Sequence, residues 1–305
     1  MEQSSEKSLD FEPPADLPRL PRRQSDSSKY DYGRVVIVAG SRGMAGAAAL
    51  SAMAALRSGA GLVEVIVPES IQATVASFDP CVMTHGLPED DEGRFALSAL
   101  AQIHKRCTRA DVVALGPGLG RSDGLIGIVH DLWKTLPMPV VVDADALWAL
   151  AQDSEWQKVE HAGPRVLTPH AGELQYLLGD NPSRRLSHPR KDLEHAATRL
   201  AEEAGVVIVL KGPASLVTDG TASTHNETGN PGMASAGTGD VLTGIITALV
   251  AQQLSIFDAA RLGTWIHGAA GDVARIECGE YSLTASQVIN SLSIPFMRCV
   301  TISNT

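Results

Sequence analysis

Short apolar runs alternate with segments of helical pattern along most of this 305-residue chain, and no other feature limits its possible folds as much. Most runs are rich in β-branched residues and end in glycine or a polar residue, which is typical of strands buried on both faces. They occupy residues 34–40, 62–68, 111–116, 139–144, 165–170 and 206–212. The alternation predicts an α/β fold in which helices cover both faces of a mostly parallel sheet.

The remaining patterns indicate one domain. Residues 215–226 have the pattern of a hairpin, with Asp219 and Gly220 in its turn. Helical patterns cover residues 237–252, 256–276 and 284–292. Residues 1–32 contain few apolar side chains and many serines, prolines and charged residues, which is typical of a flexible segment. We therefore expect a flexible tail at 1–32 and a single domain at 33–300.

Composition and charge exclude several classes of function. The net charge of −10 disfavours binding to nucleic acids and to anionic membranes, and no apolar run is long enough to span a bilayer. The four cysteines lie far apart without a CxxC pair, which argues against disulfide bonds and a zinc site. The first residues lack the pattern of a signal peptide. We expect a cytoplasmic protein that acts on small molecules.

Glycines and polar residues recur where the predicted strands end. Ligands of open α/β sheets bind beyond the carboxyl ends of the strands, so these residues mark the expected site. Glycine at a single strand end needs no functional explanation, but five such loops at one edge of a sheet favour a binding site. The loops are Gly40-Ser41-Arg42-Gly43, Gly116-Pro117-Gly118-Leu119-Gly120, Asp143-Ala144-Asp145, Thr168-Pro169-His170 and Lys211-Gly212.

Two common nucleotide-binding motifs are absent from these loops. No segment matches GxxxxGK[ST], which excludes a P-loop protein, and neither GPGLG nor GSRGMAG fits GxGxxG. A dinucleotide-binding dehydrogenase is therefore a poor interpretation of the sequence.

The segment 229–250, GNPGMASAGTGDVLTGIITALV, places a glycine-rich loop directly before an apolar helix. Backbone N–H groups at such a helix start are unpaired and can bind an anion, such as a phosphoryl group. Asp240 lies in the first helical turn, where it can accept a proton from a hydroxyl that attacks this phosphoryl group. The alternative is that Asp240 only complements the helix dipole, worth about 0.3–1 kcal/mol, which leaves the glycines unexplained.

Several motifs follow one another along residues 46–272. They are, in this order, GAAALSAMAALRSGAGLVEV, GPGLG, DADAL, LTPHAGE, VLKG, GNPGMASAGTGDVLTG and HGAAGD. Together they resemble the ADP/ATP-dependent NAD(P)H-hydrate dehydratases of the ribokinase-like superfamily. LTPHAGE and GNPGMASAGTGDVLTG are the specific motifs, whereas GPGLG alone is common. The resemblance implies a ribokinase-like three-layer α/β/α sandwich.

The resemblance implies a function in metabolite repair. The family uses ADP or ATP, with Mg²⁺, to phosphorylate the ring hydroxyl of hydrated NAD(P)H and then eliminates phosphate to restore NAD(P)H. The substrate is the S epimer, and many members of the family carry an N-terminal epimerase domain that interconverts the two epimers; for this chain we expect a separate epimerase as partner. Since only about 32 residues precede the first predicted strand, we expect no epimerase activity in this chain. The family also implies a homo-oligomer, often a tetramer.

The same motifs imply roles for the predicted site residues. Asp240 would be the catalytic base, with the transferred phosphoryl group bound by the backbone of Gly237, Thr238 and Gly239. Asp240 would also bind the hydrate, together with Ala47, Gly118 and His170. The nucleotide would be bound by Lys211, Gly212, Pro213, Ala214, Ser215 and Gly239. Because Pro213 lacks a backbone N–H, it removes one possible contact with phosphate.

Some of these roles have structural alternatives. His170 could be a structural histidine, and Lys211 a solvated lysine at a strand end. Glu173 is the predicted support for Mg²⁺, a role that Asp143 and Asp145 could share, but it could also cap its helix. His267 and Asp272 of HGAAGD are expected to fix helix packing, not to react.

Two other functions are compatible with the same motifs. A kinase of a small alcohol, such as a vitamin precursor, would use the same anion site and base, and LTPHAGE and GNPGMA argue against it. A non-enzymatic nucleotide sensor would not need Asp240. The sequence leaves open the choice between ADP and ATP and that between NADH hydrate and NADPH hydrate.

Overall fold

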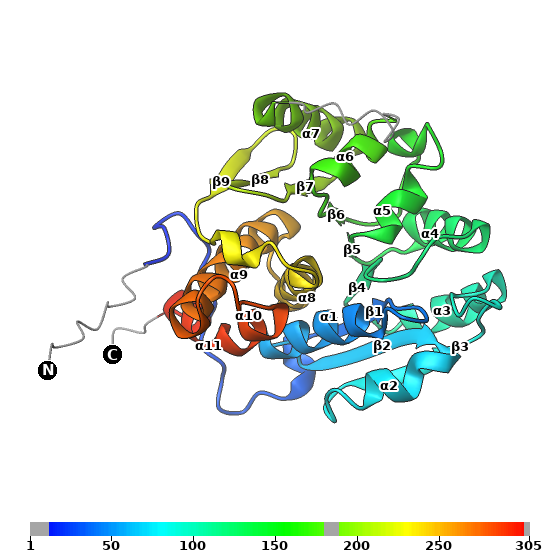
Figure 1. Ribbon diagram of the computed structural model, residues 1–305, viewed down its shortest axis with the longest axis horizontal. Coiled ribbons are helices and arrows are strands. Elements are labelled where there is room, and N and C mark those ends of the chain that lie inside the picture. Colours follow the sequence, from blue (N-terminus) through cyan, green and yellow to red (C-terminus); the bar gives the residue numbers. More distant parts are fainter. Residues whose placement is uncertain (1–11, 180–188, 302–305) are drawn as a thin grey trace, which may run out of the picture.

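The computed structural model describes residues 12–179 and 189–301, which form a nine-stranded sheet between two layers of helices (Figure 1). The strand order is β3-β2-β1-β4-β5-β6-β7-β8-β9. Strands β1 to β7 are parallel, whereas β8 and β9 are antiparallel. The strands are β1 (Arg34–Val38), β2 (Leu62–Pro68), β3 (Met83–Leu87), β4 (Val112–Leu115), β5 (Val140–Val142), β6 (Arg165–Leu167), β7 (Val207–Leu210), β8 (Ser215–Thr218) and β9 (Ser223–Asn226).

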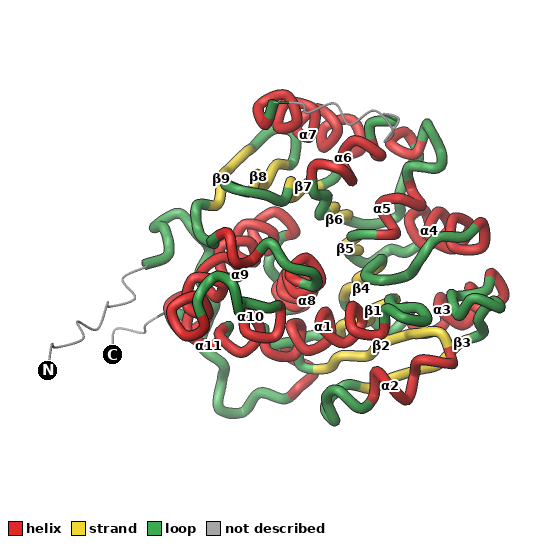
Figure 2. Tube along the Cα trace, in the orientation of Figure 1, coloured by secondary structure: helices red, strands yellow, loops and turns green. Residues whose placement is uncertain are grey.

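Helices connect most of the parallel strands and continue the chain after β9 (Figure 2). The α-helices are α1 (Ala45–Arg57), α2 (Gln72–Ala76), α3 (Leu100–Cys107), α4 (Asp123–Thr135), α5 (Asp145–Leu150), α6 (Ala171–Leu177), α7 (Arg190–Ala204), α8 (Thr238–Ala251), α9 (Ile256–Cys278), α10 (Ala285–Ser291) and α11 (Ser293–Cys299). The short 3₁₀ helices are η1 (Lys29–Tyr32), η2 (Glu69–Ile71), η3 (Leu97–Ala99), η4 (Trp156–Lys158) and η5 (Pro231–Met233). The described chain thus confirms the predicted alternation.

The alternation of side chains along each strand divides the interior into two cores. Val35 and Ile37 of β1 pack on the side of α1, α8 and α9, whereas Val36 and Val38 pack on the side of α3 to α7. Successive side chains of a strand point to opposite faces, so one run of valines supplies both cores. This explains why the predicted strands are apolar throughout.

The strand order changes direction between β1 and β4, which places loops from five strands at one edge. The chain passes from β1 to β2 and β3 on one side, then returns to β4 on the other side of β1. In open α/β sheets the crevice at this reversal is where ligands bind. The carboxyl ends of β1, β4, β5, β6 and β7 carry the glycine and polar loops that the sequence indicated.

Part of the segment predicted to be a flexible tail packs against the domain. Leu17 and Leu20 are buried in the core that contains α8 and α9. Leu20 pairs with Val300, and its N–H donates to the carbonyl of Cys299. Residues 17–20 of the expected tail therefore contact the domain through buried leucines and backbone bonds to the last described residues. Residues 1–11 of the expected tail lie outside the described part of the chain.

Among the strands and α-helices, β3, α2, α3 and α11 were not predicted from the sequence. Strand β3, of sequence MTHGL, lies at the edge of the sheet and pairs with β2, so neither a continuous apolar run nor a strict alternation marks it. Helix α11 contains Pro295 near its start, where the missing N–H of proline costs no helical hydrogen bond. Within the described ranges, no helix has both the length and the apolar character needed to cross a membrane.

Candidate active site

The junction between the glycine-rich loop and α8 is held in a defined shape. Gly237 adopts a positive φ of 90°, and the Cβ of any other residue there would lie 2.5 Å from Cδ1 of Leu50. The hydroxyl of Thr238 donates to the carbonyls of Met233 and Ser235, both at 2.9 Å, which ties the loop to the helix start. Glycine is therefore required at position 237, and the N-terminus of α8 faces the open edge of the sheet.

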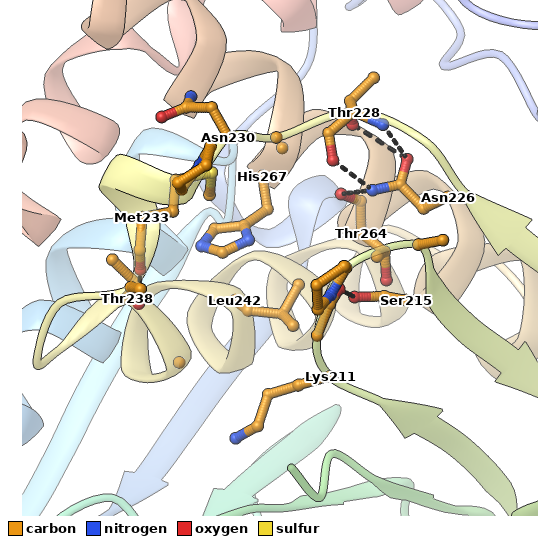
Figure 3. Close-up of a pocket in the computed structure, with 18 of the residues that line it drawn as sticks. Lys211, Ser215, Asn226, Thr228, Asn230, Met233, Thr238, Leu242, Thr264 and His267 are labelled. Atoms are coloured by element: carbon orange, nitrogen blue, oxygen red, sulfur yellow. Dashed lines mark hydrogen bonds between the residues drawn. The ribbon is translucent and has the colours of Figure 1, made fainter. Parts of the chain in front are cut away.

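A cavity of about 900 Å³ lies beside this helix start (Figure 3). Its walls come from the β7–β8 loop, the segment from the end of β9 to the start of α8, and the middle of α9. The volume is in the range of small-molecule binding sites. The lining residues are His170, Lys211, Gly212, Pro213, Ala214, Ser215, Asn226, Glu227, Thr228, Gly229, Asn230, Pro231, Met233, Ala234, Ser235, Thr238, Gly239, Leu242, Thr264, His267 and Gly268.

Lys211 and Asp143 form a partly buried ion pair at one end of the cavity. Nζ of Lys211 lies 2.7 Å from Oδ1 of Asp143 and 3.5 Å from Oε2 of Glu173. The hydroxyl of Thr243 in α8 donates to Oδ2 of Asp143 at 2.7 Å. Burial lowers the pKa of Lys211, but Asp143 and Glu173 outweigh it, and the pKa lies above its ordinary value. Lys211 therefore carries a fixed positive charge and is not a freely solvated lysine.

Asp240 is the acid of this site with the most strongly altered pKa. Burial raises the pKa of its carboxyl to about 7, and the negative charge of Asp143 acts in the same direction, whereas Lys211 lowers it. The hydroxyl of Ser51 in α1 donates to the backbone carbonyl of Asp240 at 3.0 Å. A carboxylate whose pKa is near neutrality is suited to accept and release a proton at pH 7.

His170 and Glu173 form a capping box at the start of α6. Nδ1 of His170 accepts from the backbone N–H groups of Gly172 and Glu173, at 3.0 and 3.2 Å. The carboxylate of Glu173 accepts from the N–H of His170 at 2.8 Å. The helix-capping alternative for Glu173 is thus observed, and the same carboxylate also faces Lys211. The imidazole of His170 remains more than half exposed and lines the cavity.

Ala47 of α1 and Gly118 of the loop after β4 face each other. A Cβ on Gly118 would lie 2.9 Å from Cβ of Ala47, and Gly118 has a positive φ of 63°. The hydroxyl of Ser41 donates to the carbonyl of Gly118 at 2.8 Å. The small residues therefore allow the loop after β4 to approach α1 closely, and neither residue lines the 900 Å³ cavity.

The structure brings the other predicted nucleotide-binding residues together. Lys211, Gly212, Pro213, Ala214 and Ser215 all line the cavity, and so does Gly239. Ala214 has a positive φ of 49°, which is unfavourable for a residue with a Cβ. The surrounding loop therefore holds the backbone of Ala214 in a strained conformation. A Cβ on Gly239 would lie 3.3 Å from Nζ of Lys211, so this glycine leaves space next to the charge.

Sequence reasoning did not identify the wall formed by β9 and α9. Asn226 donates to the carbonyls of Thr228 and Thr264, so these residues close the cavity as one hydrogen-bonded group (Figure 3). Asp272 accepts from the N–H of Gly229 and has the packing role expected of it. His267 instead lines the cavity. The only signal for this wall was the HGAAGD motif, which does not show what its histidine faces.

His267 is kept uncharged by its surroundings. Burial lowers the pKa of its imidazole to about 4, and the backbone of Thr238 offsets a part of this effect. Its Nε2 atom is buried without a hydrogen-bond partner in the described chain. The cavity therefore receives its positive charge from Lys211, not from His267.

Comparison with known proteins identifies the family. A family model described as NAD(P)H-hydrate dehydratase matches residues 35–293. The chain is 43% identical, over 275 residues, to the bifunctional NAD(P)H-hydrate repair enzyme Nnr of Moorella thermoacetica. That match covers 90% of this chain and 51% of the relative, and the corresponding enzyme of Vibrio cholerae is 38% identical with the same coverage. The chain thus spans about half the length of these curated relatives.

Solved structures agree with this result. The ADP/ATP-dependent NAD(P)H-hydrate dehydratase of Bacillus subtilis, co-crystallised with ATP and Mg²⁺, superimposes with a TM-score of 0.76 and 26% identity. The match covers 93% of this chain and 99% of that one. The hydroxyethylthiazole kinase of Pyrococcus horikoshii, at 13% identity and a TM-score of 0.52, shares the fold alone. The predicted ribokinase-like fold is confirmed, and the chain belongs to the NAD(P)H-hydrate dehydratase family.

Proposed function

We propose that this chain dehydrates the S epimer of hydrated NADH and NADPH at the expense of ADP or ATP. The observation that carries the proposal is the position of Asp240. Its carboxyl, with a pKa of about 7, lies in the first turn of α8, within electrostatic range of Lys211. The anion site of α8 and a base are thus combined at one helix start, as phosphoryl transfer to a hydroxyl requires.

The reaction follows from this arrangement in two steps. Asp240 accepts the proton of the ring hydroxyl while the oxygen attacks the terminal phosphorus of the nucleotide, and AMP or ADP leaves. Backbone N–H groups of Gly237, Thr238 and Gly239 would stabilise the charge on the transferred phosphoryl group. Loss of a ring proton and cleavage of the C–O bond then release phosphate and restore the double bond. Phosphate leaves far more readily than hydroxide, which explains why a kinase-like site serves a lyase.

The two substrates would meet at the start of α8. Lys211 to Ser215 and Gly239 line the cavity of about 900 Å³, which we assign to the nucleotide. Ala47, Gly118 and His170 would bind the hydrate next to Asp240. A cytoplasmic location, a homo-tetramer and a partnership with a separate epimerase stay predictions.

Magnesium would be bound mainly through the nucleotide phosphates. Within the described residues, no group of three or more His, Cys, Asp or Glu side chains is arranged to bind a metal. Mg²⁺ commonly keeps several waters and takes one or two carboxylates plus substrate phosphates, so the absence of a complete cage is compatible with its use. Glu173, which faces Lys211 at 3.5 Å, would be the supporting carboxylate. The ion would neutralise charge on the phosphates.

Recovery of NADH absorbance from purified NADH hydrate tests the proposal. The protein is incubated with Mg²⁺ and with ADP, ATP or no nucleotide. Recovery that requires a nucleotide is expected, and the faster nucleotide identifies the phosphoryl donor. If folded protein that binds nucleotide restores no NADH, the proposal is wrong, and a stable phosphorylated alcohol from a screen of vitamin precursors would then identify a kinase.

A further inference from the structure

The proposed hydrate site has an excess of negative charge. The carboxyl groups of Asp143, Asp145 and Glu173 all raise the pKa of Asp240, and the whole chain carries a net charge of −10. A dinucleotide carries at least two negative charges on its diphosphate. Because like charges repel, its binding requires a cation close to the site. Lys211 is already paired with Asp143 and Glu173.

Three arginines lie on the loops around Gly118, and two of them use terminal nitrogens in contacts within the protein. Arg94 pairs with Asp90 at 2.9 Å and with Glu92 at 3.0 Å, and it also donates to the carbonyl of Arg121. Arg42 pairs with Glu89 at 3.4 Å and donates to the carbonyl of Asp91. The guanidinium groups of these two arginines are thus used to hold the loop after β3.

Of these three, Arg121 is the arginine whose ion pair in the described chain uses Nε and leaves its two terminal nitrogens without a protein partner. Its Nε lies 3.5 Å from Oδ1 of Asp145, which in the described part of the chain is its one ion-pair partner. The guanidinium carbon lies 5.1 Å from the ring centre of Trp148 and 5.7 Å from that of Tyr176. Contacts with aromatic rings hold an arginine in place without using its N–H groups. The side chain is half exposed, so its terminal nitrogens can reach a ligand.

Arg121 lies in the loop that carries Gly118, one of the residues proposed to bind the hydrate. It follows Gly120, whose N–H donates to Oδ2 of Asp145 at 2.9 Å. The negative charge of Asp145 raises the pKa of Asp240. Gly118 lies three residues before Arg121 in the same loop. Neither Arg121 nor its aromatic neighbours line the cavity assigned to the nucleotide. A ligand that is bound between Ala47, Gly118 and Asp240 and extends along this loop would reach Arg121.

We propose that Arg121, held by Trp148, Tyr176 and Asp145, binds the diphosphate of the hydrated dinucleotide. A guanidinium presents parallel N–H groups that match two phosphate oxygens, and it can donate to both at once. Arg121 would thereby favour dinucleotides over smaller nicotinamide compounds. The inference rests on the proposed function, because it assigns a subsite for the substrate of that reaction.

Kinetics of Arg121→Gln test this subsite. KM for NADH hydrate is expected to rise about tenfold, the loss expected for one hydrogen-bonded contact with a charged group, with kcat nearly unchanged. KM for ADP or ATP should stay within twofold. Arg121→Lys should recover part of the affinity, since it keeps the charge and loses the paired geometry. Arg109→Gln, at an exposed arginine before β4 and outside the site loops, is the matched control and should change KM by less than twofold.

Salt dependence separates ligand binding from a purely structural role. KM of the wild type for NADH hydrate should rise with ionic strength, and this rise should be smaller in Arg121→Gln. A structural role in joining α5 to α6 would instead lower kcat and thermal stability and leave the salt dependence unchanged, which would overturn the inference. An unaltered KM in Arg121→Gln would also overturn it. If the wild type itself restores no NADH, the proposed function fails, which is a distinct outcome.

Discussion

At the scale of single residues, groups around Asp240 have opposing effects on the pKa of its carboxyl. Burial and Asp143 raise the pKa of its carboxyl to about 7, and Lys211 lowers it. We predict that Asp240→Asn lowers kcat by about 10²–10⁴-fold, the usual contribution of a general base, while binding of ADP or ATP is largely kept. Calorimetric titration with nucleotide and the NADH-recovery assay measure the two effects separately. An Asp240→Asn variant with full activity would exclude Asp240 as the base.

The same substitution should stabilise the fold, with a defined pH dependence. The folded pKa of Asp240 is raised above that of an unfolded chain, so the free energy of unfolding falls as pH rises from about 4 to about 7. Asp240→Asn removes this loss. Its free energy of unfolding should exceed that of the wild type by at most about 4 kcal/mol at pH 8, and by little at pH 4. Urea unfolding of both proteins at the two pH values measures the difference. Equal gains at both pH values would contradict this explanation.

The pH dependence of turnover should follow from the same carboxyl. A base is inactive while protonated, so kcat/KM for NADH hydrate should rise with pH to about 7 and then level off. Lys211→Met removes the positive charge that lowers the pKa of Asp240, so the rise should move to higher pH. Profiles are measured at saturating nucleotide and compared with Lys134→Met, an exposed lysine of α4. Coincident profiles for Lys211→Met and wild type would show that Lys211 does not influence the base.

From the sequence we could predict which residues lie together at the candidate site. Their protonation and the strain of their backbone could not be predicted. Lys211, Asp240 and His170 stood out because they lie at strand ends or at a helix start. The pairing of Lys211 with Asp143 and the buried position of His267 depend on segments far apart in the chain. The positive φ of Ala144, 51°, also depends on such contacts and is not encoded in its own residue type.

At the scale of elements, two glycines at the start of α8 have different functions. Gly237 has a positive φ, and a Cβ there would meet Leu50 at 2.5 Å, so Gly237→Ala should lower thermal stability as well as activity. Gly239 has no such strain, and its Cβ would meet the flexible end of Lys211 at 3.3 Å. Gly239→Ala should therefore fold normally and lose turnover, because the methyl group takes space needed by phosphate. Thermal unfolding and kcat of both variants provide the test, and a destabilised Gly239→Ala would contradict it.

Strands and helices were predictable where their own residues have a clear apolar pattern. The strands at the centre of the sheet are apolar on both faces, and α8 is mostly apolar after its first turn. Strand β3 was not predicted, because its sequence MTHGL lies at the sheet edge, is partly exposed and lacks such a pattern. The segment 12–22 has no regular repeat, since single leucines and backbone bonds to residues 299–301 fix it.

At the scale of the whole molecule, the segment before β1 connects the two ends of the described chain. Leu20 is buried and exchanges backbone hydrogen bonds with Cys299 and Thr301. Leu20→Ala should lower the free energy of unfolding by about 2 kcal/mol or more, with KM for both substrates unchanged. Leu97→Ala, at an exposed leucine, is the control and should have little effect. A changed KM in Leu20→Ala would indicate that this segment acts on the site.

The bond between Ser51 and Asp240 joins residues that lie 189 positions apart, and this separation has a consequence for synthesis. Ribosomes add about 5–20 residues per second, so roughly 10–40 s pass between the emergence of the two residues. During this time α8 is missing, and the apolar face of β1 that it will cover is open to solvent and to other chains. The site is thus among the last parts of the nascent protein to form, and chaperones that bind apolar surface have a long period in which to act.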